Sequence, residues 1–145
     1  MQFIVESRCA VEAGIVVRFP YIVISIRDPG RRPARIPRTA GWRGTLCLSF
    51  HDAEPTRGLR LPDSIRLMTV ADAERIWRFV QEHLPEIGAI VCHCEQGQSR
   101  SPAVAAALAE ALGEDSKPIV RWTQPNQTVY RLLRSTIARL QQTEA

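Results

Sequence analysis

The chain has 145 residues, of which 45% are hydrophobic and 23% are charged. These values are ordinary for a soluble globular protein, and the length predicts a single domain covering residues 1–145. No apolar run approaches the roughly 20 residues of a membrane-spanning helix, and the first residues lack the pattern of a signal peptide. We therefore expect a cytoplasmic protein without membrane insertion.

The formal net charge is +4, and Lys117 is the only lysine among the 19 lysine and arginine residues. The planar guanidinium of arginine suits phosphate and carboxylate oxygens. The positive charge is compatible with an anionic substrate, but equally with solubility alone. It does not by itself indicate a nucleic-acid partner.

Four cysteines occur, at Cys9, Cys47, Cys92 and Cys94, too few and too scattered for a disulfide-built fold. We expect free, buried thiols at Cys9 and Cys47. The last two cysteines flank His93 without the C-x-x-C spacing of a zinc site, and no second ligand pair lies nearby. We therefore expect no metal and no other cofactor.

Short runs rich in β-branched and aromatic residues predict strands at 21–26 and 45–50. Residues 87–93 are nearly all apolar, which is typical of a strand buried on both faces of a parallel sheet. Residues 1–7 are a weaker strand candidate.

Two amphipathic helices are predicted, at 69–84 and 126–142. The first opens with Thr69 and Asp72 in the spacing of a capping box. The second begins at Asn126, a residue type favoured at helix starts.

A third helix is predicted at 101–113, which is rich in alanine. We expect Ser101 as its N-cap, Pro102 at its first helical position and Gly113 as its terminator.

Strands separated by helices indicate an α/β fold, here a three-layer sandwich with a short, largely parallel sheet flanked by helices. Ligands of such sheets bind at the carboxyl ends of the strands. The predicted strands run into Asp28, Asp52 and Cys94. These three residues should therefore gather at one edge of the sheet.

The segment between the last strand and the alanine-rich helix has the character of an anion-binding loop. A helix N-terminus offers unpaired N–H groups and a partial positive charge, and Gly97 allows the loop to turn sharply before it. Arg100 can grip an oxyanion with two parallel N–H bonds. Cys94 at the base would be held as a thiolate beneath the bound anion, ready for nucleophilic attack.

Residues 93–101 read H-C-E-Q-G-Q-S-R-S and match the pattern H-C-x-x-G-x-x-R-[ST]. The chain thereby resembles the cysteine-dependent protein tyrosine phosphatase superfamily, in particular its compact dual-specificity branch of prokaryotic and phage type. The resemblance implies that Cys94 is the nucleophile, that Arg100 binds the phosphoryl oxygens and that His93 orders the loop. It implies that Ser101 assists the sulfur as leaving group. The phosphate would lie against the backbone of the loop residues Glu95, Gln96, Gly97, Gln98 and Ser99.

The resemblance also requires an aspartate as general acid. We favour Asp52, because it directly follows the strand that should neighbour the strand of the nucleophile. Asp63 is the alternative, because its sequence distance from Cys94 suits a loop without an insertion. Cys92 precedes Cys94 by two residues, and we expect a buried structural thiol there, although a protective disulfide is the alternative.

The leading hypothesis is therefore a phosphomonoester hydrolase acting on phosphotyrosine, or with dual specificity also on phosphoserine and phosphothreonine, in proteins. The same mechanism on a phosphoinositide, a nucleotide or an RNA 5′-phosphate is an alternative, and the arginine-rich segment 27–43 should influence that choice. A phosphate-binding module without activity is a third possibility, although such proteins usually lose the cysteine, the arginine or the acid.

Overall fold

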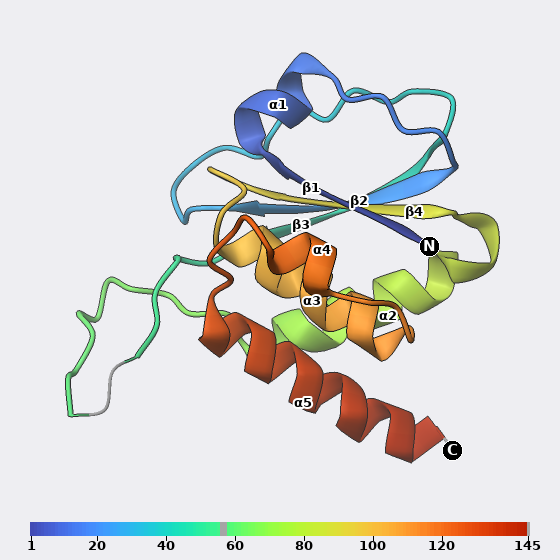
Figure 1. The fold of residues 1–145 in the computed structure, drawn as a ribbon. Helices are drawn as coiled ribbons and strands as arrows, with labels where there is room; N and C mark the ends of the chain where they lie inside the picture. Colours follow the sequence, from blue (N-terminus) through green and yellow to red (C-terminus); the bar gives the residue numbers. More distant parts are fainter. Residues whose placement is uncertain (56–57, 145) are drawn as a thin grey trace.

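The computed structural model describes residues 1–55 and 58–144, which form a parallel sheet covered by helices on both faces (Figure 1). The strands run parallel in the order β1-β4-β2-β3. Their bounds are β1 Gln2–Ser7, β2 Tyr21–Arg27, β3 Trp42–Ser49 and β4 Ala89–Cys94.

The helices are distributed unequally over the two faces of the sheet. Short α1 lies on one face, and the remaining helices lie on the other (Figure 1). Their bounds are α1 Arg8–Ala13, α2 Val70–His83, α3 Arg100–Ala111, α4 Lys117–Val120 and α5 Gln127–Glu144, with a 3₁₀ turn at Leu84–Glu86. The predicted α/β fold with helices on both sides of a parallel sheet is confirmed.

The larger of two hydrophobic cores fills the space between the sheet and helices α2, α3 and α5. It includes Ile24 of β2, Cys92 of β4 and Leu133 of α5. A smaller cluster under α1 includes Val11 and Val23. Every residue of β4 is buried, as its apolar run predicts for a central strand of a parallel sheet.

The sequence patterns predicted most of these elements. The capping box of Thr69 and Asp72 is present at the start of α2. Asn126 caps α5, because its side-chain oxygen accepts a hydrogen bond from the N–H of Val129 at 3.0 Å. Gly113 follows α3 with a positive φ of 78°.

The expected start of α3 was wrong. The helix begins at Arg100, so Ser101 lies within its first turn instead of capping it, and Pro102 stands at the third helical position. Proline is tolerated there because the first-turn N–H groups have no partner within the helix. Helices α1 and α4 were not predicted, because each is too short to show an apolar period.

Among the described residues, no helix combines the length and the apolar character needed to span a membrane.

Candidate active site

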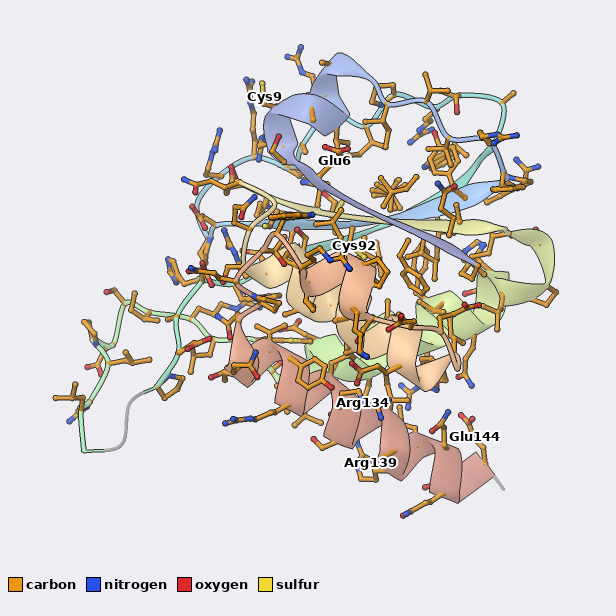
Figure 2. The ribbon with its side chains drawn as sticks, viewed as in Figure 1. Glu6, Cys9, Cys92, Arg134, Arg139 and Glu144 are labelled. Carbon is orange, nitrogen blue, oxygen red and sulfur yellow. The ribbon has the colours of Figure 1, made fainter. Side chains whose placement is uncertain are left out.

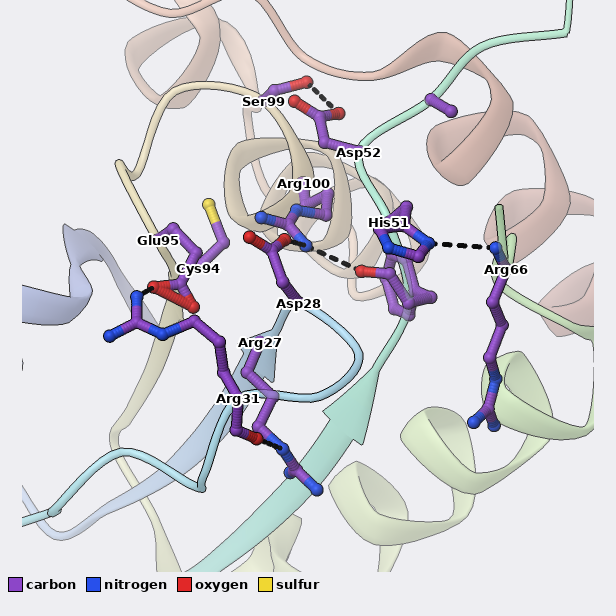
Figure 3. Close-up of polar contacts among 12 residues, drawn as sticks. Arg27, Asp28, Arg31, His51, Asp52, Arg66, Cys94, Glu95, Ser99 and Arg100 are labelled. Atoms are coloured by element: carbon purple, nitrogen blue, oxygen red, sulfur yellow. Dashed lines mark hydrogen bonds and ion pairs between the residues drawn. The ribbon is translucent and has the colours of Figure 1, made fainter. Parts of the chain in front are cut away.

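A cavity of about 650 Å³ opens at the carboxyl ends of β2, β3 and β4. Its walls include Asp28 after β2, Asp52 after β3, and Cys94 and Arg100 on either side of the β4–α3 loop, residues 95–99 (Figure 3). The parallel sheet thus brings Asp28, Asp52 and Cys94 to one edge, as the sequence predicted.

Gly97 allows the β4–α3 loop to lie directly against β1. Its φ is +73°, a conformation that side chains disfavour. A Cβ at this position would lie 2.8 Å from the carbonyl carbon of Glu6. The predicted need for glycine is therefore confirmed on two grounds, backbone torsion and close approach.

Three carbonyl groups of the loop are bonded by neighbouring segments, whereas four of its five N–H groups have no partner among the described residues. The oxygens of Glu95, Gln98 and Ser99 accept hydrogen bonds from the backbones of Arg8, Gln124 and Asn126, respectively. Within the described part of the chain, the N–H groups of the loop residues 95, 96, 98 and 99 have no protein acceptor. Unpaired N–H groups that converge in a loop form a nest for an anion.

Cys94 lies at the base of this loop with only 3% of its surface exposed. Its Sγ accepts a hydrogen bond from the N–H of Gly97 at 3.3 Å and lies 3.2 Å from Oγ of Ser101. The first-turn position of Ser101, which corrects the expected N-cap, is what brings its hydroxyl group to the sulfur.

Arg100 is buried and oriented through one end of its guanidinium. Nη1 donates to the carbonyl oxygen of Phe50 at 2.6 Å and lies 2.8 Å from Oδ1 of Asp28 (Figure 3). Nε is also buried, but it has no partner among the described residues. A buried donor without an acceptor is costly, so an acceptor bound at Nε would remove this cost.

His93 is fully buried, and both of its ring nitrogens form hydrogen bonds. Nδ1 lies 3.1 Å from the carbonyl oxygen of Cys94, which can only accept, so Nδ1 carries the proton. Nε2 then accepts from the hydroxyl of Ser25 at 2.6 Å. Burial lowers the pKa of His93, against the opposing effect of the bond to Cys94. A neutral His93 therefore braces the loop.

The two candidate acids occupy different surroundings. Asp52 lines the cavity, and its Oδ1 accepts hydrogen bonds from Ser99 Oγ at 2.7 Å and from Asn126 Nδ2 at 2.8 Å. Asp63 is 89% exposed, pairs with the exposed Arg60 at 3.1 Å and is not among the residues that line the cavity. Asp52, and not Asp63, therefore lines the same cavity as Cys94.

Glu95 connects the loop to the other face of the sheet. Its carboxylate pairs with Arg31 of the β2–β3 connection (Figure 3). It also lies 3.6 Å from Nη1 of the buried Arg8 in α1. Arg8 in turn donates to the carbonyl oxygen of Arg32 at 2.9 Å. The β4–α3 loop is thereby tied to the arginine-rich segment.

The four cysteines are free. Cys92 lies in the core beneath the sheet (Figure 2), where burial raises its pKa, so it stays a protonated structural thiol. The expected burial of Cys9 and Cys47 was wrong, since both are exposed. Cys9 is on the outer side of α1 (Figure 2), and Cys47 is on an edge strand.

Sequence reasoning missed several groups that complete the site. Ser25 and the carbonyl oxygen of Phe50 gave no signal, because their roles depend on the order and register of the strands. Asp28 was predicted to lie at the edge of the sheet, but its pairing with Arg100 was not predicted. A polar residue inside an apolar strand, as Ser25 is, was the one sign available.

No family model and no curated protein sequence matches the chain. Similar solved structures include human DUSP28, with 17% identity, a TM-score of 0.57 and coverage of 97% of this chain and 94% of that one. A human tyrosine phosphatase-like serine/threonine/tyrosine-interacting protein has 18% identity, a TM-score of 0.53 and coverages of 83% and 78%. PTPMT1 in complex with PI(5)P has 15% identity, a TM-score of 0.52 and coverages of 86% and 81%. The chain therefore has the fold of the cysteine-dependent protein tyrosine phosphatases.

Proposed function

We propose that the protein is a cysteine-dependent phosphatase that hydrolyses phosphomonoesters, with phosphotyrosine, or phosphotyrosine together with phosphoserine and phosphothreonine, in proteins as its substrate. One observation carries this proposal. Cys94, Arg100 and the β4–α3 loop line one cavity, and within the described part of the chain the N–H groups of loop residues 95, 96, 98 and 99 and the Nε of Arg100 have no acceptor. A phosphoryl group supplies the oxygen acceptors that these donors lack.

In the first step, the Cys94 thiolate attacks phosphorus, so that an S–P bond forms while the bond between phosphorus and the leaving oxygen breaks. Asp52 donates its proton to the leaving oxygen. Its Oδ1 is held by Ser99 and Asn126, which leaves Oδ2 to carry that proton. Arg100 and the loop N–H groups stabilise the charge on the phosphoryl oxygens.

In the second step, water attacks the phosphocysteine and the S–P bond breaks. The Asp52 carboxylate takes the proton of the water, and the Ser101 hydroxyl donates a hydrogen bond to the departing sulfur. The 3.2 Å separation of Ser101 Oγ from Cys94 Sγ suits this role. Both steps leave free enzyme and inorganic phosphate.

The decisive experiment measures turnover of p-nitrophenyl phosphate without added metal. We expect activity in the wild type and its loss in Cys94→Ser, because serine is a far weaker nucleophile at neutral pH. Cys47→Ser is the matched control, since Cys47 is an exposed thiol outside the cavity, and it should retain wild-type turnover. Activity that survives in Cys94→Ser would refute the mechanism.

The general acid is tested with Asp52→Asn and the matched Asp63→Asn. With a poor leaving group such as phenyl phosphate, we expect Asp52→Asn to reduce kcat about a hundredfold or more, because leaving-group protonation is lost. With p-nitrophenyl phosphate the loss should be smaller, and Asp63→Asn should resemble the wild type. The assignment is wrong if Asp63→Asn alone shows the dependence on leaving group.

A non-protein phosphate is the alternative substrate, because one structure of similar fold, PTPMT1, holds PI(5)P. A panel of phosphopeptides, phosphoinositide vesicles, nucleotides and 5′-phosphorylated RNA distinguishes these classes by kcat/KM. We expect the phosphotyrosine peptides to rank first. A module that only binds phosphate would bind p-nitrophenyl phosphate without releasing nitrophenol.

A further inference from the structure

β3 is an edge strand whose outer side is open. It pairs with β2 on one side only, so alternate backbone groups point away from the sheet. Within the described part of the chain, no backbone bond outside the sheet engages the N–H or C=O groups of residues 43–49. This edge is a row of free donors and acceptors, and the strand contains no proline.

A groove of about 500 Å³ runs along this edge. One wall comes from Ala34, Ile36 and Arg38 of the β2–β3 connection, and the other comes from Phe79 of α2. The side of β3 itself lies between them, with Trp42, Gly44, Thr45 and Cys47 as its lining residues. The groove therefore exposes apolar walls beside unpaired backbone groups.

The charge around the groove is positive. Arg38 stacks with its guanidinium carbon 4.6 Å from the centre of the Trp42 ring. Arg38, Arg35 and Arg43 are all exposed, and none of the three forms an ion pair with a described acidic residue. No acidic residue is among the described residues that line the groove.

We propose that this groove binds an extended acidic segment of another protein, which adds a fifth strand to the sheet at β3. Backbone hydrogen bonds provide affinity in this mode of recognition, and side-chain contacts provide specificity. A second copy of the chain is a poorer occupant, because pairing two β3 edges would bring the arginines of both copies together. The proposal concerns a surface separate from the cavity at Cys94, and it does not depend on catalysis.

The test uses synthetic eight-residue peptides, the length of β3, in which valine alternates with glutamate or with lysine. Binding is measured by calorimetry and by the alkylation rate of each cysteine, read by mass spectrometry. We expect the acidic peptide to protect Cys47 and to bind about tenfold or more tightly than the basic peptide. Cys9, an exposed thiol on α1 that does not line the groove, should react at an unchanged rate.

Two further acidic peptides test strand addition directly, one N-methylated at odd positions and one at even positions. In an added strand, only alternate N–H groups face the sheet. One isomer should therefore lose binding while the other retains it. Equal binding of both isomers, equal binding of acidic and basic peptides, or an unprotected Cys47 would each overturn the proposal.

Charge reversal in Arg38→Glu/Arg43→Glu should transfer the preference to the basic peptide. Arg121→Glu/Arg131→Glu is the matched control, since these residues are exposed and lie at the C-cap of α4 and within α5, whereas Arg38 lines the groove and Arg43 is on β3 itself. Protection of Cys47 that rises with protein concentration, without peptide, would instead assign the edge to a second copy and refute the proposal. The N-methylation test uses unaltered protein, so it decides the matter even if the reversed variant does not fold.

Discussion

Arg100 carries its charge inside the protein, and two fixed acceptors compensate for it. Phe50 contributes a carbonyl oxygen and Asp28 a carboxylate, and both act on Nη1. Nε is also buried and has no hydrogen-bond partner among the described residues. Under the proposed function, an arginine already held at one end in this way would stabilise the charge of a phosphoryl group electrostatically.

Asp28 is therefore expected to matter for turnover through its pairing with Arg100. Asp28→Ala should lower kcat/KM for p-nitrophenyl phosphate by about tenfold or more, because the buried cation loses its counter-charge and its orientation. Asp28→Asn keeps an oxygen acceptor and should lose less. Asp115→Ala removes an equivalent charge outside the cavity and should leave kcat/KM unchanged. Equal kinetics in Asp28→Ala and the wild type would contradict this role.

His93 should make the stability of the protein depend on pH. Burial lowers its pKa in the folded state, whereas the unfolded chain has the ordinary value of about 6.5. Above that pH the imidazole is neutral in both states. Below it the unfolded chain binds a proton that the folded protein resists, so the free energy of unfolding falls by up to about 1.4 kcal/mol per pH unit.

Urea unfolding between about pH 8 and about pH 5.5 checks this expectation. The fall in the free energy of unfolding should be weaker in His93→Asn than in the wild type. His83→Gln removes a histidine outside the site, one that pairs with Glu86, and should leave the contribution of His93 in place. The same slope in His93→Asn and the wild type would be inconsistent with our account.

The β4–α3 loop shows how the end of a strand becomes a binding site. β1 supports it from below through the contact at Gly97, and the backbones of Gln124 and Asn126 hold its carbonyl groups. These constraints fix the loop while the N–H groups of residues 95, 96, 98 and 99 have no acceptor among the described residues. The chemistry of the loop therefore depends on elements on both sides of it.

Gly97 and Gly113 form a matched pair, since both have a positive φ, of 73° and 78°. A Cβ on Gly113 meets nothing within 4 Å, whereas one on Gly97 meets the backbone of β1. Gly113→Ala should cost about 1 kcal/mol of stability with turnover preserved. Gly97→Ala should lose more stability and about a hundredfold in turnover, because the loop must shift. Comparable turnover in the two variants would show that the loop tolerates the displacement.

At the scale of the whole molecule, most of the buried apolar residues lie on one side of the sheet. The core under α2, α3 and α5 is large, and the cluster under α1 is small. Helix α5 packs on α3, which carries Arg100 and Ser101. The stability of the active site therefore depends on a helix layer beneath it.

Leu133→Ala tests this dependence, because Leu133 on α5 is completely buried in the large core. We expect a loss of about 2–5 kcal/mol in the free energy of unfolding, measured in urea. Leu59→Ala makes the same change at a side chain that is 70% exposed, and it should cost less than about 0.5 kcal/mol. Similar losses in both variants would show that Leu133 does not anchor the layer.

The fold was predictable where a local pattern carries the information. The apolar run of β4 and the capping box of α2 each depend on a few neighbouring residues. The start of α3 was misjudged because proline fits several first-turn positions. Pro102 therefore did not determine whether Ser101 precedes the helix or lies within its first turn. Helix α1 was missed because six residues are too few to show a helical period.

The part of the site that could be predicted from the sequence is the part formed by the β4–α3 loop and its two flanking residues. Cys94, Gly97 and Arg100 follow one another within the β4–α3 connection, and their arrangement follows from a strand, a turn and a helix. Ser25, Asp28 and Arg8 act on that loop from other elements. Their contacts arise from strand order and layer packing, which no local pattern specifies.

One carboxylate joins three distant parts of the chain. Oδ1 of Asp52 is bonded by Ser99, 47 residues later, and by Asn126, 74 residues later. If Asp52 is the general acid, its support is complete only when the segment leading into α5 has folded into place. During synthesis on the ribosome, a chain that has emerged only as far as α4 would therefore lack the bond from Asn126 that holds Asp52.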